Sequence, residues 1–298
     1  MRITFNSLFR DGMRNIENAS RSLLEAQQQV SSGKRVDRAS DDPSAATGGL
    51  ASRAELATVQ RYEKAADSVY SRLTVVDTVL SDVISKLTAA QSAIMSAQGT
   101  TQSPVQREAA AQELEGVRSS IVDDFNMSFN GTFLFAGAKS TTPPYTVASD
   151  GTVSAYAGST TEIEVDINRN SAVTVVLNAE SIAKGSAGAD VFSVLNDAIT
   201  AARSGDSAAL QTAMAGIKEA FERTTAAQSR VGGDMRSIDG EKLRLEQMRI
   251  SAMSRVSKLE DANLAEAVSS MNRADTAYKA ALGAVSTASR VSLLDYLG

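Results

Sequence analysis

The chain has 298 residues, of which 43% are hydrophobic and 22% are charged, and its formal net charge at pH 7 is −5. It contains no cysteine, which excludes disulfides and thiol catalysis, and no histidine, which removes the commonest general base and metal ligand. Only 5% of the residues are aromatic, a composition that favours long, closely packed helices over a thick globular core. We therefore expect a structural protein and no enzyme, with no catalytic residues, cofactor or metal. The acidic charge balance also argues against nucleic acid as a partner.

Signals for membranes and for targeting are missing from the residue pattern. No apolar run is long enough to cross a bilayer, so we expect no membrane insertion. The first residues, MRITFNSLFRDG, lack the charged-then-apolar order of a cleaved signal peptide.

The first predicted helix covers about residues 8–32. Its large apolar side chains recur every seven residues, and small side chains form a companion edge, which together make a heptad stripe. The large residues are Phe9, Ile16, Leu23 and Val30, and the small ones are Gly12, Ala19 and Ala26. A single helix with so thin a stripe is marginal in water, so we expect it to need a partner helix from the same chain or from a neighbouring chain.

Residues 31–46, SSGKRVDRASDDPSAA, interrupt the helical pattern and predict a helix–loop–helix corner. Gly33 suits the left-handed cap of a helix, and the cations Lys34 and Arg35 favour the negative end of the helix dipole. The residues that suit the start of the following helix are Ser40, Asp41, Asp42 and Pro43. The two sides of the corner therefore carry opposite charges.

The second predicted helix has the most regular pattern, because its apolar residues follow a 3-4-3-4 spacing without interruption. These residues are Val59, Tyr62, Ala66, Val69, Leu73, Val76, Leu80, Val83, Leu87, Ala90, Ile94 and Ala97. At about 1.5 Å per residue the stripe is roughly 60 Å long. Gly99 ends this helix, and a third helix is predicted over about residues 104–128.

Helical periodicity disappears between about residues 139 and 188, where Thr, Val, Ser and Gly dominate. Asp150-Gly151 is a strong hairpin-turn signal between the first two of four predicted strands. The predicted strands are residues 145–148, 152–156, 161–167 and 172–177. We interpret this segment as a small inserted β domain whose acidic outer face is solvated surface, with a calcium site as the alternative.

Helical patterns return over residues 191–202, and a break at Ser204-Gly205-Asp206 precedes a long helix that starts near Leu210. The pattern leaves open whether this helix passes through Gly232-Gly233. Two stripes follow, with a phase break between them at residues 259–264. The first comprises Ile238, Leu245, Ala252 and Leu259, and the second comprises Leu264, Ala267, Met271, Ala274, Tyr278, Ala281, Val285 and Ala288.

Five segments carry motif-like patterns. They are SSGKRV with SDDP in residues 31–43, FLFAG at 133–137, LEDANLAEA at 259–267, YKAAL at 278–282 and SLLDYL at 292–297. Together they resemble the bacterial flagellin superfamily. The SDDP form, FLFAG and the SLLDYL ending are more similar to its hook–filament junction branch than to flagellin.

The resemblance implies a mainly α fold with a small inserted β domain, in which both chain ends build a long antiparallel helical bundle or coiled coil. Five parts are expected. They are an N-terminal assembly helix and loop (1–42), an ascending helical core (43–138), the β domain (139–188), a descending helical core (189–258) and a C-terminal assembly helix (259–298).

The resemblance also implies a function, that of a structural protein forming the junction ring between hook and filament of the bacterial flagellum. In the family the termini are disordered in the monomer and form an inner coiled-coil tube on assembly. The implied partners are further copies of the chain, the other hook-associated junction protein, flagellin and a flagellar export chaperone. Export through the flagellar type III secretion system would place the chain in the extracellular flagellum. A filament-forming flagellin and a soluble signalling coiled coil are the alternatives.

The expected assembly interface combines the two terminal stripes with the charges of the corner. Its residues are Phe9, Ile16, Leu23, Val30, Lys34, Arg35, Arg38, Asp41, Asp42, Leu264, Ala267, Met271, Ala274, Tyr278, Ala281, Val285 and Ala288. The corner charges either pair within the loop or reach an adjacent subunit, and we favour subunit contact for some of them.

Overall fold

The computed structural model describes residues 5–99, 103–148, 151–169, 171–184 and 189–297, with side chains from residue 9 to residue 287 in the terminal helices. The chain divides into two compact units. Unit 1 combines Met1–Val59 with Gln247–Gly298, and unit 2 is Gln60–Glu246. Two long helices, α2 (Pro43–Ala97) and α6 (Ser207–Glu260), contribute to both units. No helix among the described residues is long and apolar enough to span a membrane.

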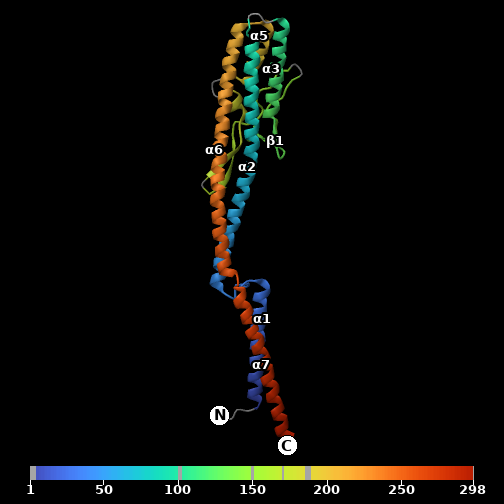
Figure 1. The fold of residues 1–298 in the computed structure, drawn as a ribbon, viewed down its shortest axis with the longest axis vertical. Helices are drawn as coiled ribbons and strands as arrows, with labels where there is room; N and C mark the ends of the chain where they lie inside the picture. Colours follow the sequence, from blue (N-terminus) through green and yellow to red (C-terminus); the bar gives the residue numbers. More distant parts are fainter. Residues whose placement is uncertain (1–4, 100–102, 149–150, 170, 185–188, 298) are drawn as a thin grey trace. The chain divides into compact units, whose positions relative to one another are not determined.

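Unit 1 contains a hairpin of the two terminal helices, α1 (Phe5–Ser32) and α7 (Leu264–Leu297), which lie side by side (Figure 1). Both predicted stripes are turned toward the partner helix. Ala26 and Ala267 are buried, and the half-buried members are Ile16, Leu23, Val30, Met271, Ala274, Tyr278, Ala281 and Val285. A Cβ on Gly12 would lie 2.7 Å from Cγ2 of Val285, so the small edge of the stripe lets the two helices approach closely.

Unit 2 is built on the apolar face of α2, which lies beside α3 (Pro104–Phe125), α5 (Val191–Ser204) and α6 (Figure 1). Every member of the predicted α2 stripe from Ala66 to Ala97 is buried. The sequence pattern therefore identified the face of α2 around which this unit packs.

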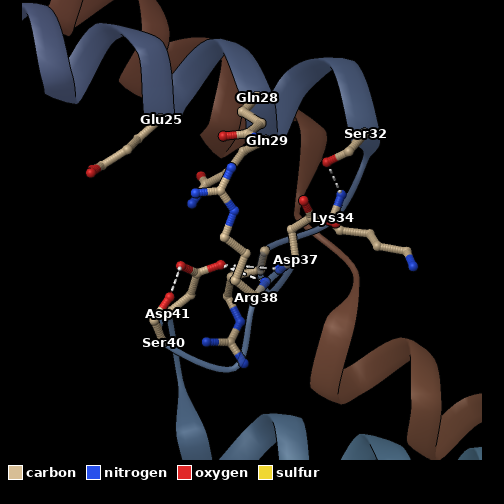
Figure 2. Close-up of a pocket in the computed structure, with 10 residues that line it drawn as sticks. Glu25, Gln28, Gln29, Ser32, Lys34, Asp37, Arg38, Ser40 and Asp41 are labelled. Carbon is tan, nitrogen blue, oxygen red and sulfur yellow. Dashed lines mark hydrogen bonds between the residues drawn. The ribbon is translucent and has the colours of Figure 1, made fainter.

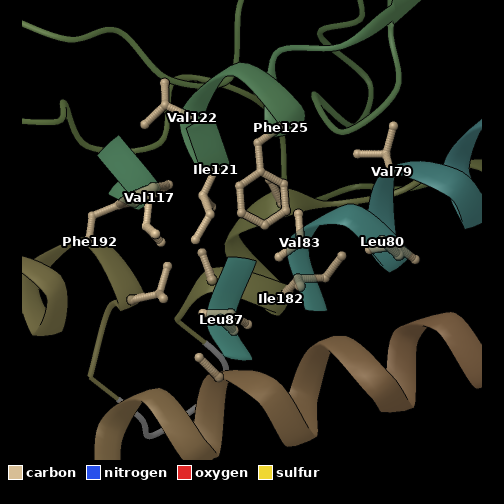
Figure 3. Close-up of a cluster of buried hydrophobic side chains, with 14 of the residues drawn as sticks. Val79, Leu80, Val83, Leu87, Val117, Ile121, Val122, Phe125, Ile182 and Phe192 are labelled. Atoms are coloured by element: carbon tan, nitrogen blue, oxygen red, sulfur yellow. The ribbon is translucent and has the colours of Figure 1, made fainter. Parts of the chain in front are cut away.

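The core of unit 2 forms where α2, α3, α5 and the short α4 (Ala179–Ala183) meet (Figure 3). The side chains that converge there include Val83, Leu87, Ile121, Phe125 and Phe192. Aromatic rings pack edge to face, with centroids 5.5 Å apart for Phe125 and Phe135 and 4.8 Å apart for Tyr145 and Phe192. Burial raises the pKa of the Tyr145 phenol, which therefore stays protonated.

Local caps explain where α3 begins and ends. The Ser103 hydroxyl accepts the backbone N–H of Gln106, and the Gln106 side chain accepts the backbone N–H of Ser103, which forms a capping box. The helix ends at Phe125, before the predicted residue 128, and the side chain of the following Asn126 bonds the backbone C=O and N–H of Tyr145.

The descending helix is continuous at Gly232-Gly233, where the sequence pattern did not decide whether it is interrupted. Gly205, with φ of 74°, ends α5 at the predicted break, and α6 then runs through Gly232-Gly233 to Glu260. The next helix, α7, begins only at Leu264. The predicted phase break is therefore a real interruption between two helices.

The β region contains two separate antiparallel pairs. β1 (Ser128–Phe129) pairs with β2 (Thr132–Phe133), and β3 (Ile163–Asn168) pairs with β4 (Ser171–Val176) in the register Val165↔Val173. The last two predicted strands are confirmed by β3 and β4. In β3 the acidic side chains are more exposed than the apolar ones, as the alternation predicted.

The predicted hairpin over residues 145–156 is present, although it is too short to count as a pair of regular strands. An antiparallel bridge joins Val147 and Val153, the N–H of Ala148 donates to the C=O of Thr152 at 2.9 Å, and the N–H of Ser154 donates to the C=O of Thr146 at 2.8 Å. Ser149-Asp150 lies outside the described residues. At the start of the hairpin, the Asn126 side chain bonds the backbone of Tyr145.

Two arginines on the long helices hold the stretch that runs from β2 to the residues before α5 (132–189). Arg72 on α2 and Arg223 on α6 both donate several hydrogen bonds to it, and burial lowers the pKa of the half-buried Arg72 guanidinium. The acceptors of Arg72 are the C=O of Val175 at 2.7 Å, the hydroxyl of Thr132 at 2.9 Å and the C=O of Phe133 at 3.3 Å. The acceptors of Arg223 are the C=O groups of Ile182 at 3.1 Å, Ala183 at 2.9 Å and Ala189 at 3.4 Å.

Close packing of α5 on α6 predicts the effect of a methyl group at Gly216. A Cβ there would lie 2.8 and 2.9 Å from the two γ-methyl groups of Val194, so rotating the valine cannot relieve the overlap. We expect Gly216→Ala to lower the free energy of unfolding by roughly 1–3 kcal/mol. Denaturant unfolding of the full chain, followed by far-UV circular dichroism, measures this change.

Gly116→Ala is the matched control, because a Cβ on this exposed α3 residue has nothing within 4 Å. Here alanine should stabilise the helix by up to about 1 kcal/mol. Equal effects of the two substitutions would contradict the close approach of α5 and α6.

Candidate assembly site

The terminal hairpin has an exposed apolar edge beside the buried part of its shared stripe, and the stripe members Phe9 and Leu264 belong to this edge. On α1 the exposed fractions are 44% for Phe9, 49% for Met13 and 62% for Leu24. On α7 they are 56% for Leu264, 40% for Val268 and 42% for Leu282. With about 3.6 residues per turn, the other positions fall next to the shared stripe on both helices. The hairpin thus has apolar surface left over after its two helices have paired.

The corner between α1 and α2 begins with the predicted glycine cap. Gly33 has φ of 68°, and its N–H donates to the C=O of Gln29 at 2.9 Å, which ends α1. A single left-handed glycine therefore turns the chain out of the helix.

Asp42 caps the start of α2. Its Oδ1 accepts the N–H of Ser44 at 3.1 Å, the N–H of Ala45 at 3.0 Å and the Ser44 hydroxyl at 2.8 Å. The Ala45 N–H, the Ser44 hydroxyl and the Arg35 guanidinium together lower the pKa of the Asp42 carboxyl to about 2. This aspartate is an acceptor fixed within its own chain.

Asp41 closes the loop itself. Its Oδ2 accepts the N–H of Arg38 at 2.8 Å and the N–H of Asp37 at 3.2 Å. These backbone donors, the Arg38 N–H first, lower the pKa of the Asp41 carboxyl, and the Ser40 hydroxyl and the Arg38 charge act in the same direction. Both aspartates of the SDDP motif therefore organise the loop.

The corner pairs with the segment that joins α6 to α7. The N–H groups of Arg35 and Val36 donate to the C=O of Glu260 at 2.7 and 3.3 Å, and the N–H of Ala262 donates to the C=O of Gly33 at 2.9 Å. The Arg35 guanidinium adds bonds to the C=O of Leu259 at 2.9 Å and to Asp42 at 3.3 Å. The sequence placed these two motif-bearing stretches at opposite chain ends, and the fold brings them together.

Glu260 is not among the interface residues expected from the sequence, although it is the buried charge of this corner. It is 4% exposed, and its carboxylate forms ion pairs with Arg53 on α2 and, at 3.9 Å, with Lys34. A Cβ on Gly49 would lie 2.5 Å from Oε1 of Glu260. The pair Gly48-Gly49 near the start of a helix was the available signal that another segment approaches there.

A polar hollow of about 490 Å³ lies between the last turns of α1 and the corner loop (Figure 2). Its lining includes Glu25, Gln28 and Gln29 from the helix and Arg38 from the loop. Within the described part of the chain, neither the Arg38 guanidinium nor the Glu25 carboxylate forms a hydrogen bond or an ion pair. Both charges remain available to groups outside the chain.

The predicted interface residues fall into three groups. Most stripe residues lie at the α1–α7 contact, while Phe9 and Leu264 are largely exposed and the side chain of Ala288 lies outside the described residues. Lys34, Arg35, Asp41 and Asp42 use polar atoms within the chain. Their contact with a neighbouring subunit stays a prediction. Among the described residues, no group of three or more acidic side chains is arranged to hold a metal ion.

Comparison with known proteins places both ends of the chain in one family. Residues 3–140 match the helical N-terminal region of bacterial flagellin, and residues 214–297 match its helical C-terminal region. The chain is 29% identical over 229 residues to flagellar hook-associated protein 3 of Salmonella typhimurium, which covers 74% of this chain and 68% of the relative. It is 26% identical over 262 residues to the protein of the same name in Escherichia coli, covering 80% of this chain and 81% of the relative.

Solved structures share the fold. Flagellar hook-associated protein 3 from Legionella pneumophila superposes with a TM-score of 0.63 at 14% identity, covering 70% of this chain and 98% of that one. FlgL from Xanthomonas campestris gives a TM-score of 0.61 at 18% identity, covering 68% and 98%. The predicted mainly helical fold with a small β insertion is thereby confirmed.

The cap formed by Asp42 predicts a pH dependence of the corner. Its folded-state pKa of about 2 lies below the ordinary value of 3.8, so the ionised carboxylate stabilises the corner fully above the ordinary value. This stabilisation is lost as the pH falls from 3.8 toward about 2. Titration of the carboxyl carbons by NMR should show Asp42 ionising near the lower value, and ionisation near the ordinary value would contradict the cap. In Ser44→Ala the missing hydroxyl donor should raise the pKa part of the way.

Proposed function

Because the chain carries both helical regions of bacterial flagellin and so belongs to the flagellin family, we propose that it is the structural protein of the hook–filament junction. The observation that carries this proposal is the similarity to two proteins named flagellar hook-associated protein 3, which extends over 74% and 80% of the chain. In this role the chain forms a ring of identical subunits between the other hook-associated junction protein and the first flagellin subunits.

We propose coupled folding and assembly as the mechanism. Ordering the 28 residues of α1 costs backbone entropy of roughly 1–2 kcal/mol per residue, and its shared stripe with α7 is only half-buried at most positions. The exposed edge that includes Phe9, Leu24 and Leu264 supplies further apolar burial only when a neighbouring subunit covers it. Ordering of the terminal helices therefore requires the ring.

The corner contributes polar contacts to the same interface in this proposal. Arg38 and Glu25 line the polar hollow, and among the described residues neither side chain forms a hydrogen bond or an ion pair, so they are the corner groups best placed to bind a neighbouring copy. Lys34, Arg35, Asp41 and Asp42 contribute through the shape of the loop that they hold. Direct contact would be supported by a pair of charge reversals, one at Arg38 or Glu25 and one at its partner residue on the neighbouring copy. Each single reversal should abolish assembly, and the two together should restore it.

Export follows from the proposed location. The chain leaves the cell through the flagellar type III secretion system as an unfolded polypeptide, bound beforehand by a cytoplasmic export chaperone. A sequence without cysteine suits this route, because no disulfide can form and block unfolding.

A filament-forming flagellin is the second candidate, because the two matched regions are those of the flagellin family as a whole. Assembly behaviour separates the candidates. Purified flagellin polymerises into long filaments, whereas a junction protein remains monomeric until it binds its hook-associated partner.

Deletion of the gene in its host tests the junction role directly. We expect intact hooks without filaments, with unpolymerised flagellin released into the medium, because the adaptor between hook and filament is missing. Electron microscopy of the cells and analysis of the culture supernatant give the answer. Loss of the filament subunit itself from the supernatant would identify the chain as flagellin.

A charge in the α1–α7 stripe should block assembly. Ala274 is half-buried on the face of α7 that meets α1, so Ala274→Glu places a carboxylate among apolar side chains. We expect the cells to lose their filaments and their swimming, while denaturant unfolding of unit 2 is unchanged. Ala109→Glu, the same substitution at an exposed position of α3, is the control and should leave swimming intact. Normal swimming of the Ala274→Glu strain would contradict the role of the stripe.

A further inference from the structure

Glu260 is a buried charge that joins three separate stretches of unit 1. Its carboxylate pairs with Arg53 from α2 and with Lys34 from the corner, and its backbone C=O accepts the N–H groups of Arg35 and Val36. Only 6% of its side chain is exposed, whereas the Glu55–Arg255 ion pair between the same two helices leaves 45% and 44% of its side chains exposed. The two pairs connect the same helices and differ in the burial of the carboxylate, since the Arg53 side chain is itself 51% exposed.

Burial makes the Glu260 arrangement sensitive to each of its parts. A buried carboxylate is costly unless it is paired and hydrogen-bonded, and removing one partner leaves an uncompensated charge. The carboxylate also needs the space that Gly49 leaves, since a Cβ there would lie 2.5 Å from Oε1. We therefore expect the corner, the start of α2 and the end of α6 to order cooperatively.

We propose that Glu260 is the positioning residue of a terminal joint, formed by residues 33–36, 49–53 and 259–262, that is already folded in the free chain and sets the starting point of both α1 and α7. This inference rests on the proposed function, in which the two helices order only on assembly. Nucleation is the step of helix formation with the largest free-energy cost, because the backbone of several residues must be fixed before the first hydrogen bond forms. A folded joint holds the last turn of α1 next to the first turn of α7, so the two helices extend from one base.

Hydrogen exchange in the free, full-length chain tests the joint. In the unsubstituted protein, the amides of Arg35, Val36 and Ala262 should be protected. In Glu260→Gln they should exchange at least about 10-fold faster, although the first two lie far from the substituted residue in sequence. Gly49→Ala should have the same effect by displacing the carboxylate while the charge remains. Amides of the unit 2 core should stay protected in every variant, which shows that the chain is folded.

Glu55→Gln is the matched control, because it removes an exposed ion pair between the same helices. It should change exchange at the joint less than about 2-fold. In a double-substitution cycle, Arg53→Gln should add little to Glu260→Gln, since the two residues act as a pair. Unchanged exchange at Arg35 and Val36 in Glu260→Gln would overturn the joint.

The same measurement separates failure of the joint from failure of the proposed assembly mechanism. Protection of residues 9–25 and 268–285 in the free chain would contradict ordering on assembly, while the variants would still report on the joint. Rapid exchange of Arg35, Val36 and Ala262 in the unsubstituted free chain would overturn the joint and leave ordering on assembly intact.

Discussion

The apolar face of α2 is the constraint on which the rest of unit 2 depends. Its buried side chains from Ala66 to Ala97 provide a continuous surface, and α3, α5, α6 and the β region find their places by covering parts of it. Apolar burial of this extent is the dominant favourable contribution to folding, and polar contacts then select the arrangement. The half-buried Lys86–Asp124 pair at 2.6 Å, between α2 and α3, is an example of such a contact.

The terminal hairpin of unit 1 contrasts with this core. Its stripes include Gly12, Ala26 and Ala267, so α1 and α7 approach closely, but most of the stripe is only half-buried, whereas the α2 stripe from Ala66 to Ala97 is fully buried. Helices of this kind gain stability from further neighbours, which is the physical basis of the assembly that we propose. One chain thus combines a unit with its own core and a hairpin that is incomplete by itself.

Periodic features could be predicted from the sequence, because an amphipathic helix repeats its signal many times. The stripe through Leu73 and Leu87, the glycine cap at Gly33 and the break near Glu260 all follow from such local patterns. In residues 145–156 the turn signal identified the hairpin, but it could not reveal how short the pairing is or that the Asn126 side chain bonds the backbone of Tyr145.

The partners of single polar residues could not be predicted where these partners lie far away in the sequence. In the sequence, Glu260 is part of an acidic motif and has the pattern of a solvated surface residue. In the structure it is buried and paired with Arg53. Arg72 similarly occupies an ordinary polar position of α2, and nothing in its neighbourhood along the chain indicates that it binds strands far away in sequence. Pairing across such distances is a property of the fold and leaves no periodic trace.

The way in which Arg72 and Arg223 hold the β region has a consequence for how this part of the chain can evolve. Five of their six acceptors are main-chain carbonyl groups, which every amino acid provides. These polar contacts therefore depend on the path of the chain, whereas the apolar part of the attachment depends on buried side chains such as Tyr145 and Ile167. Exposed side chains of this segment can therefore change without loss of these hydrogen bonds, because none of the main-chain acceptors depends on the identity of a side chain.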